Sequence, residues 1–588
     1  MHRMTILILA VTLSAPAGVA TTPAAQAKPA ATAKAKPKLT PYQKMQQAGF
    51  QAMGKLWAIK DPEQRVTAWV HFAKTHPAFL TDRSDGATNA AYALHGYIKA
   101  NRKDGAKLQR RLAAVDRAFP AGTVGKSLFE TMTATSLLKN DAALDYAAEL
   151  DQNSIRLLRQ KPYIAWERRD HAARQAYAAE GKFNVPEAFS IQDAENEYRE
   201  EMASRYSLLG RIEEKMGRPD AALVSYRRAL GFHADMSAYR GVAKLELAQG
   251  DREAALEALY SADLTGHLDA KSIHAMRRLY AELHPGASRE SLARLLDRKY
   301  EATFHNPVQW SAYAGEPGAP RRAVLAELMT GAGCIPCMAP DLALDAALDR
   351  YNRRTLVLVV YHDNAPDSDP LANDVTDARD RYYSTGGSTP HAFLDGKEIA
   401  LVQGTPRHAQ AAYDAMTKPI DRLLGGPARA ELRIMAQRRG RSVRVRVWGT
   451  VLTPSRPLAL HIDLVSREVS YSGENGLRLQ RMVVRATARL AHDGGGIPVH
   501  GRRFAVSYTF RIPGIEKANL AYYKQFDAEV KKRTRGLFGA TYREHKNLIN
   551  PDRLAIVAFV QDNGNHAVLQ SAYEPVLSTA VAGAKEAR

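Results

Sequence analysis

A chain of 588 residues is too long for a single hydrophobic core, so we expect several domains. It carries 82 Lys and Arg against 62 Asp and Glu, a formal net charge of +20, and its two cysteines exclude a framework of several disulfides. Such a charge favours anionic polymers or lipids, but the basic residues are dispersed, and we interpret them mostly as solvated surface. No nucleic-acid-binding motif accompanies them, so we expect no nucleic-acid partner.

The first residues have the pattern of a signal peptide. His2 and Arg3 precede a short apolar run from Thr5 to Leu13, and small residues with two possible cleavage sites follow, at 18–20 and 25–27. We assign residues 1–27 to a signal peptide and 28–40, rich in Ala, Lys and Pro, to a linker. No apolar run reaches the about 20 residues that a membrane helix needs. We therefore expect an exported protein, periplasmic or secreted, without a transmembrane segment.

Residues 41–300 have helical periodicity and contain an internal repeat. Gly217, Ala222, Tyr226 and Ala229 recur 33 positions later as Gly250, Ala255, Leu259 and Ala262. This segment resembles the tetratricopeptide repeat family, whose period is 34 residues. The resemblance implies stacked helical hairpins, and either a peptide or protein partner binds them or they form a purely structural domain.

The two cysteines lie three positions apart, after a predicted linker over 301–319. An apolar run over 323–329 predicts a strand, Gly331 to Gly333 a tight turn, and 339–348 a helix. A cysteine at a helix N-terminus has a lowered thiol pKa, because the free backbone N–H groups stabilise the thiolate. Closing so short a loop restrains the unfolded chain little, so a redox role for Cys334 and Cys337 is favoured over a structural disulfide.

The residues that follow add further elements of an α/β domain. An apolar run over 355–361 predicts a buried strand, and 374–383 predicts a helix. Thr389-Pro390 precedes another strand that turns back at Asp395-Gly396. Together with Cys334-Ile335-Pro336-Cys337, this order resembles the thioredoxin superfamily, closest to its periplasmic reductases, over residues 320–424.

The resemblance implies a role for each matching residue. Cys334 would be the exposed attacking thiolate, Cys337 the resolving thiol, and Thr389-Pro390 a cis-proline loop that offers its backbone to the substrate. Pro336 before the second cysteine matches the reductive members. Two positions depart from the family pattern: Gly333 replaces an aromatic residue, and the buried acid for proton transfer is matched only by Glu327, one residue out of place.

After residue 424 the pattern changes to alternating apolar and polar residues, which predicts strands around 443–447, 458–464 and 556–560. We interpret residues 425–588 as a β-sandwich-like domain with a helical insertion over 518–535. The expected fold is thus multidomain: a helical-repeat domain, a thioredoxin-like α/β domain and a β-sandwich-like domain.

The leading functional hypothesis is an exported thiol–disulfide oxidoreductase, a reductase rather than an oxidase, that acts on protein disulfides and draws electrons from a donor protein. It needs no cofactor and no metal. One alternative is a protein-binding scaffold in which the thioredoxin-like module has no redox role. A second is a metallochaperone for Cu(I) or haem maturation, with His391 beside the cysteines.

Overall fold

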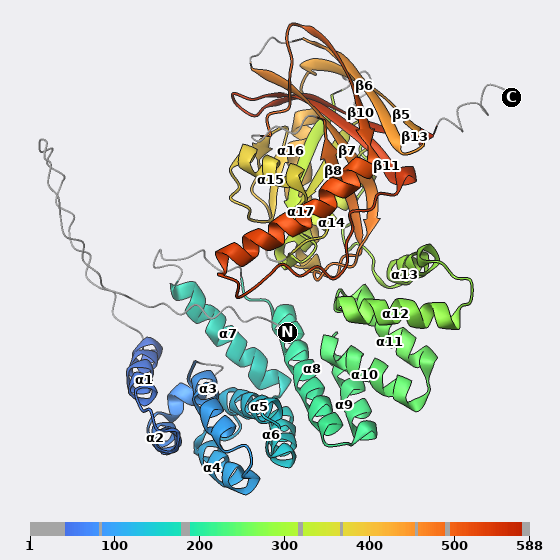
Figure 1. Cartoon of the computed structure of the whole chain (residues 1–588). Helices are drawn as coiled ribbons and strands as arrows, with labels where there is room; N and C mark the ends of the chain where they lie inside the picture. Colours follow the sequence, from blue (N-terminus) through green and yellow to red (C-terminus); the bar gives the residue numbers. More distant parts are fainter. Residues whose placement is uncertain are drawn as a thin grey trace, which may run out of the picture.

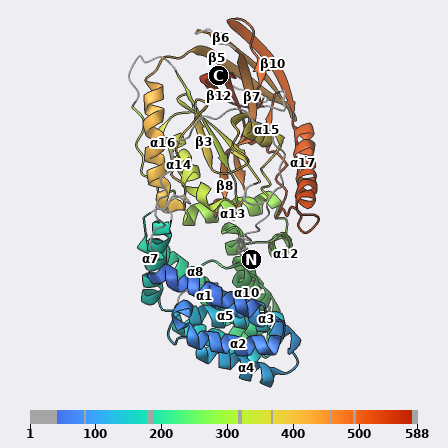
Figure 2. The ribbon, with the colours of Figure 1, turned by 90° about the vertical axis from the view of Figure 1, so that its left-hand side faces the viewer.

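The computed structural model describes residues 41–81, 85–177, 188–314, 322–364, 368–452, 457–488 and 494–578. The predicted signal peptide and the linker that follows it lie outside these residues. A helical N-terminal region is followed by α/β and strand-rich parts, as Figures 1 and 2 show, so the predicted multidomain α, α/β and β organisation is confirmed.

The helical region spans residues 41–303, and several of its helices start after a residue whose side chain caps the first turn. Asp61 accepts a hydrogen bond from the N–H of Gln64, with Pro62 in the first turn, where a missing N–H costs nothing. The helices are α1 (Pro41–Trp57), α2 (Pro62–Thr75), α3 (Asp85–Ala100), α4 (Gly105–Ala118), α5 (Val124–Lys139), α6 (Leu144–Leu157), α7 (Gln160–Tyr177), α8 (Ile191–Lys215), α9 (Pro219–Phe232), α10 (Met236–Gln249), α11 (Arg252–Leu264), α12 (Ala270–Leu283) and α13 (Arg289–Thr303), with the short 3-10 helix η1 (Pro77–Leu80).

The internal repeat corresponds to two successive hairpins, α8–α9 and α10–α11. Each hairpin turns at a glycine with positive φ, +72° at Gly217 and +88° at Gly250, a conformation that residues with a Cβ rarely adopt. Position 210 has no room for a larger residue, because a Cβ there would lie 2.7 Å from the ring of Tyr226. The repeated small and aromatic residues therefore set the close approach of paired helices.

The C-terminal part is built on a nine-stranded sheet, here the long sheet, in the order β12-β11-β7-β8-β2-β1-β3-β4, with β9 paired to β7. β1 and β2 are parallel, and β1 and β3 are antiparallel. The strands are β1 (Val324–Thr330), β2 (Leu356–His362), β3 (His391–Leu394), β4 (Lys397–Glu398), β7 (Leu458–Ser470), β8 (Leu479–Thr487), β9 (Ile497–Pro498), β11 (Leu554–Asp562) and β12 (Val568–Pro575).

A second sheet, here the outer sheet, has the order β10-β6-β5-β13. Its strands are β5 (Ala430–Arg439), β6 (Ser442–Val451), β10 (Arg503–Arg511) and β13 (Leu577–Ser578). The remaining elements are α14 (Met338–Arg350), α15 (Asp374–Tyr383), α16 (Ala409–Leu424), α17 (Ile512–Arg533), and the 3-10 helices η3 (Ile335–Cys337), η4 (Pro406–His408) and η5 (Pro551–Arg553).

The long sheet is covered on both faces, and β11 shows why. Ala555, Val557 and Phe559 belong to the core that includes α14 and α16. Ile556, Ala558 and Val560 belong to the core shared with the outer sheet. Because successive strand residues point to opposite faces, one strand contributes to both cores.

The long sheet and the outer sheet pack face to face, as the predicted sandwich-like part requires. However, the strands of the long sheet that follow residue 425 belong to the same sheet as β1 and β2. β8 pairs with β2 through Val483 and Val360. The proposed boundary at 424/425 therefore lies between α16 and β5, while the sheet runs across it.

The helical region contacts the sheets through charged side chains. Arg478, next to β8, donates hydrogen bonds of 3.0 Å to Asp263 and 2.8 Å to Asp297. The guanidinium of Arg543 lies close by and donates to the carbonyl of Leu268. The contacts of Arg478 hold α11 and α13 against the turn between β7 and β8, and Arg543 contacts the loop between α11 and α12.

Candidate functional site

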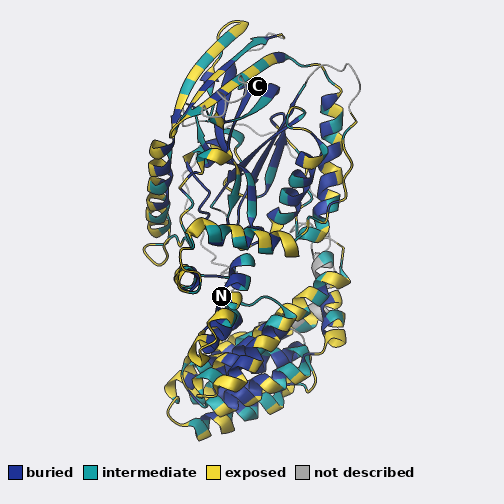
Figure 3. Cartoon of the chain, turned by 90° about the vertical axis from the view of Figure 1, so that its right-hand side faces the viewer, coloured by how far each residue is buried: buried dark blue, intermediate teal, exposed yellow. Residues whose placement is uncertain are grey.

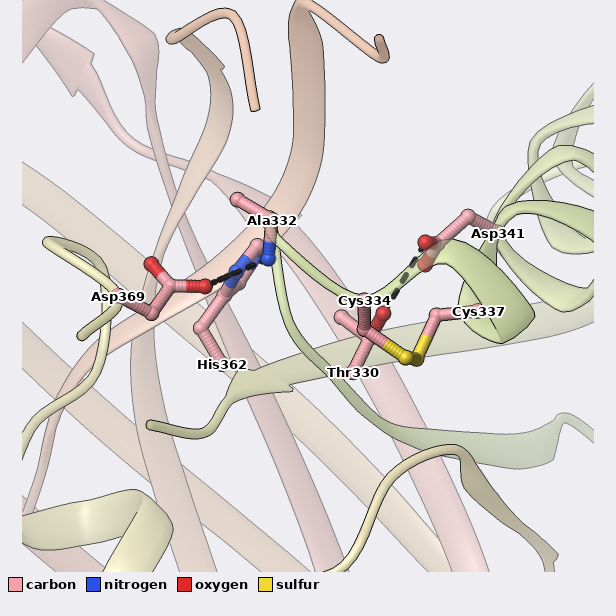
Figure 4. Close-up of a disulfide and its surroundings, with 7 residues drawn as sticks. All are labelled: Thr330, Ala332, Cys334, Cys337, Asp341, His362 and Asp369. Carbon is pink, nitrogen blue, oxygen red and sulfur yellow. Dashed lines mark hydrogen bonds and ion pairs between the residues drawn. A yellow bond between two sulfur atoms is a disulfide. The ribbon is translucent and has the colours of Figure 1, made fainter. Parts of the chain in front are cut away.

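The two cysteines form a disulfide where β1 leads into α14 (Figure 4). The sulfur atoms are 2.00 Å apart and the Cα atoms 5.3 Å apart. The N–H of Cys334 donates to the carbonyl of Gly331 at 2.9 Å, and the N–H of Cys337 donates to the carbonyl of Cys334 at 3.2 Å. The predicted order of strand, tight turn and helix is confirmed, with η3 as the first turn ahead of α14.

The expectation that Cys334 is exposed is wrong for this disulfide-bonded state. Its exposed fraction is 2% and that of Cys337 is 0%, whereas Ile335 between them is 50% exposed. A turn of residues 471–478, here the covering turn, packs against the loop before Cys334. The N–H of Asn475 donates to the carbonyl of Ala332 at 3.1 Å, and a Cβ on Gly473 would lie 2.1 Å from that same oxygen. Contacts from about 140 residues away in sequence thus hold the loop that leads into the buried Cys334.

Thr389-Pro390 lies beside the end of β1. Met329 is paired with His391, so Pro390 falls next to Thr330, from which the loop to Cys334 departs. The Thr389–Pro390 peptide bond is cis. Pro390 also lines a shallow hollow, whose other lining residues are His391, Glu398, Ile399, Ala400, Leu401 and Gln403.

Glu327 does not take the place expected for a proton-transfer group. It is three positions before Thr330 on β1, so the two side chains point to opposite faces of the sheet. Its carboxylate accepts hydrogen bonds of 2.7 and 2.9 Å from the guanidinium of Arg379 and one of 2.6 Å from Tyr383. The geometry makes Glu327 part of a buried ion pair on the far side of the sheet from Thr330.

The acid on the Thr330 side is Asp341, which sequence analysis missed. It is four residues after Cys337 and therefore lies on the same side of the helix. Figure 4 shows its carboxyl directed at Thr330, whose hydroxyl donates a 3.0 Å hydrogen bond to Oδ2. Burial raises the pKa of Asp341 well above its ordinary value, the hydroxyl of Thr330 partly opposes this, and the charge of Asp345 raises the pKa further.

Asp341 lines a cavity of about 220 Å³ between α13, α14 and β8. Its walls include the apolar side chains of Leu328 and Leu342, and Asp345 with Arg481. Burial raises the pKa of Asp345 to about 7, although Arg481 opposes the shift. The cavity therefore places the half-buried carboxyl of Asp341 beside a second carboxyl and an arginine.

A buried His–Asp pair holds the other side of the disulfide loop. Nδ1 of His362 lies 2.9 Å from Oδ2 of Asp369, and the same oxygen accepts a 2.7 Å hydrogen bond from the N–H of Ala332. Both side chains are buried. His362 and Asp369 are seven residues apart, so their pairing depends on how the loop after β2 folds back.

The described residues contain no helix long and apolar enough to cross a membrane. They also contain no group of three or more His, Cys, Asp or Glu side chains arranged to hold a metal ion. His391, the histidine considered for copper, has Nε2 2.8 Å from Ser388 and Nδ1 2.6 Å from Glu398, so both ring nitrogens already have partners.

No protein family model matches the sequence, and no curated protein matches it. Among solved structures, HBP35 of Porphyromonas gingivalis shares 16% sequence identity over 44% of this chain and 77% of its own, with a TM-score of 0.31.

Proposed function

We propose that this protein is an exported thiol–disulfide oxidoreductase of the thioredoxin-like type, acting on protein disulfides through Cys334 and Cys337. One observation carries the proposal: the only two cysteines of the chain are bonded to each other across two residues, at the start of α14. A disulfide that closes so short a loop contributes little as a staple. A reversible redox role accounts for it better.

In the reaction, a thiolate of the electron donor attacks one sulfur of the Cys334–Cys337 disulfide and forms a mixed disulfide. The second donor thiol resolves it, so two electrons enter the pair and both cysteines end as thiols after taking up two protons. Reduced Cys334 then attacks a substrate disulfide, and Cys337 releases the reduced substrate. We assign the attack to Cys334 because it borders the exposed Ile335, whereas Cys337 is fully buried.

Asp341 is the residue we assign to proton supply for Cys337. Burial raises the pKa of Asp341 well above its ordinary value, which favours the protonated carboxyl that donates to the thiolate of the buried Cys337. A buried thiolate without a proton would be costly, because burial disfavours the charged form.

The direct test is turnover with a protein disulfide. Reduction of insulin by dithiothreitol should be accelerated by the wild type and not by Cys334→Ser. Met338→Leu, a change of similar size beside the disulfide, is the matched control and should retain the wild-type rate. Equal rates for wild type and Cys334→Ser would overturn the proposal.

A second candidate function is a protein-binding scaffold, and the burial of Cys334 favours it. Under this alternative the helical hairpins bind a peptide or protein, and the disulfide stays permanently closed beneath the covering turn. The two functions differ in whether the disulfide cycles. If the isolated protein remains oxidised in dithiothreitol under native conditions and a helical-region partner is found, the scaffold is correct.

A further inference from the structure

The outer sheet has one face in the core and one face in solvent. Val443, Val445 and Val447 of β6 pack inward against the long sheet. The residues between them point outward, and Figure 3 shows exposed positions alternating along the uppermost strands. Side-chain alternation therefore collects every second residue of three strands on a single open surface.

That surface is strongly basic. We define the basic face as its six exposed arginines, two on each strand: Arg433 and Arg439 on β5, Arg444 and Arg446 on β6, and Arg503 and Arg511 on β10. The cross-strand register places these arginines on the same face of the sheet. Arg446 lies between Met435 and Ser507, and Arg444 lies between Gln437 and Thr509. Glu431 is the one acidic residue among the outward positions of these three strands.

The six arginines are not neutralised by the part of the chain that the structure describes. No ion pair joins any of them to a carboxylate there, and Arg446 instead lies over the ring of Trp448 at 5.7 Å. Two neighbouring arginines do form ion pairs: Arg438 on β5 is paired with Asp552, and Arg441 in the turn between β5 and β6 is paired with Glu516. The outward arginines of the three strands therefore keep a positive charge that no carboxylate of the described residues balances.

The basic face is a strip. From residue 431 to residue 439 a strand advances about 27 Å, and three strands span about 10 Å, given a rise of about 3.4 Å per residue and a spacing of about 4.8 Å. At least one arginine occurs at nearly every second residue along its length. A strip of this shape fits an extended linear polyanion, with arginines contacting successive anionic groups in bidentate pairs.

We propose that the basic face binds an acidic polysaccharide whose chain lies along the strands. A nucleic acid fits less well, because single strands are held by several aromatic platforms and this surface offers only Trp448, already covered by Arg446. A membrane also fits less well, because interfacial binding needs buried apolar area and Met435, 47% exposed, is the large apolar side chain that this surface exposes. The binding is independent of the redox function.

The test measures the affinity of the full-length mature protein for polygalacturonate, a carboxylated polysaccharide, with neutral dextran as the uncharged probe. The wild type should bind polygalacturonate but not dextran, and the logarithm of the binding constant should fall with the logarithm of the salt concentration. Arg444→Gln/Arg446→Gln should bind about tenfold more weakly or worse, with a shallower salt dependence. The control variant Arg102→Gln/Arg110→Gln changes two exposed arginines of the helical region. It removes the same amount of charge and should bind polygalacturonate like the wild type.

Three outcomes would overturn the proposal. Equal losses in the two double variants would show that net charge, not this surface, is responsible. Tighter binding of a single-stranded oligonucleotide, or of anionic phospholipid vesicles, that depends on Arg444 and Arg446 would assign the face to another partner. Arg433→Gln/Arg503→Gln provides a second, independent pair should the first variant fail to fold, and all variants should keep their insulin reductase activity.

Discussion

The hydroxyl of Thr330 donates a 3.0 Å hydrogen bond to Oδ2 of Asp341, and this contact joins the last residue of β1 to the first helical turn after the disulfide. It fixes the carboxyl on the side of the sheet from which the disulfide loop departs (Figure 4). The contact places a carboxyl group in the first turn of the helix that begins at the disulfide.

Asp341→Asn keeps the shape and the contact with Thr330 but removes the titrating proton. We expect reduction of the Cys334–Cys337 disulfide by dithiothreitol to slow by about tenfold or more near pH 7, because general acid catalysis is lost. The wild-type rate should change with pH, with a midpoint well above the ordinary pKa range of Asp, because burial raises the pKa of Asp341. The rate of the variant should not show this change. Asp349→Asn, at the exposed rim of the same cavity, is the control. Unchanged pH profiles would remove Asp341 from the mechanism.

Asp345→Asn should change how stability depends on pH. Burial raises the pKa of Asp345 to about 7 in the folded protein, against an ordinary value of 3.8. Between these two values the folded state binds a proton that the unfolded state has released, so the contribution of this residue to stability falls as pH rises. Urea midpoints measured from pH 4 to pH 8 should therefore decline more steeply for the wild type than for the variant. If the urea midpoints of the wild type and the variant change in parallel with pH, the raised pKa of Asp345 is contradicted.

Gly473→Ala should open the covering turn. A Cβ at this position would lie 2.1 Å from the carbonyl oxygen of Ala332, so the turn must move away from the disulfide loop. Cys334 should then react faster with dithiothreitol, and the protein should be destabilised by about 1–3 kcal/mol. Gly476→Asn is the matched control in the same turn, because the space around Gly476 is open and Asn tolerates its φ of +81°. A slower or unchanged rate in Gly473→Ala would show that the turn does not limit access.

Limited proteolysis should divide the chain after the helical region but not at residue 425. The connection between α13 and β1 carries no regular secondary structure in its described residues, whereas β7, β8, β11 and β12 tie the part after 425 to β1 and β2. We expect a helical fragment and one C-terminal fragment that spans both sheets, identified by mass spectrometry. Stable, separate fragments on either side of residue 425 would show that the long sheet is not one unit.

The elements that sequence analysis predicted well are those with a local cause. The helix over 374–383 matches α15 residue for residue, and the turn at Asp395-Gly396 forms with both residues at positive φ. Periodicity and turn chemistry act over a few residues, so they can be read from the sequence.

The features that were missed depend on contacts between distant segments. The covering turn contacts the loop before Cys334 from about 140 residues away, and no local sequence pattern predicts this contact. Asp341 lies on a helix whose residues 342–348 are apolar apart from Asp345, and its proposed role depends on its contact with Thr330. A signal for the shared sheet did exist: residues 554–560 are apolar without interruption, which is typical of a strand buried on both faces.

The measurement that tests the central claim most directly is covalent trapping of the exchange intermediate. Cys337→Ser leaves reduced Cys334 able to attack a substrate disulfide but removes the thiol that resolves the mixed disulfide. Incubated with a disulfide-containing protein and separated on a non-reducing gel, this variant should run as an adduct that dithiothreitol releases, while Cys334→Ser/Cys337→Ser should form none. No adduct with Cys337→Ser, in a protein that remains folded, would contradict the assignment of Cys334 as the attacking thiol and with it the proposed oxidoreductase.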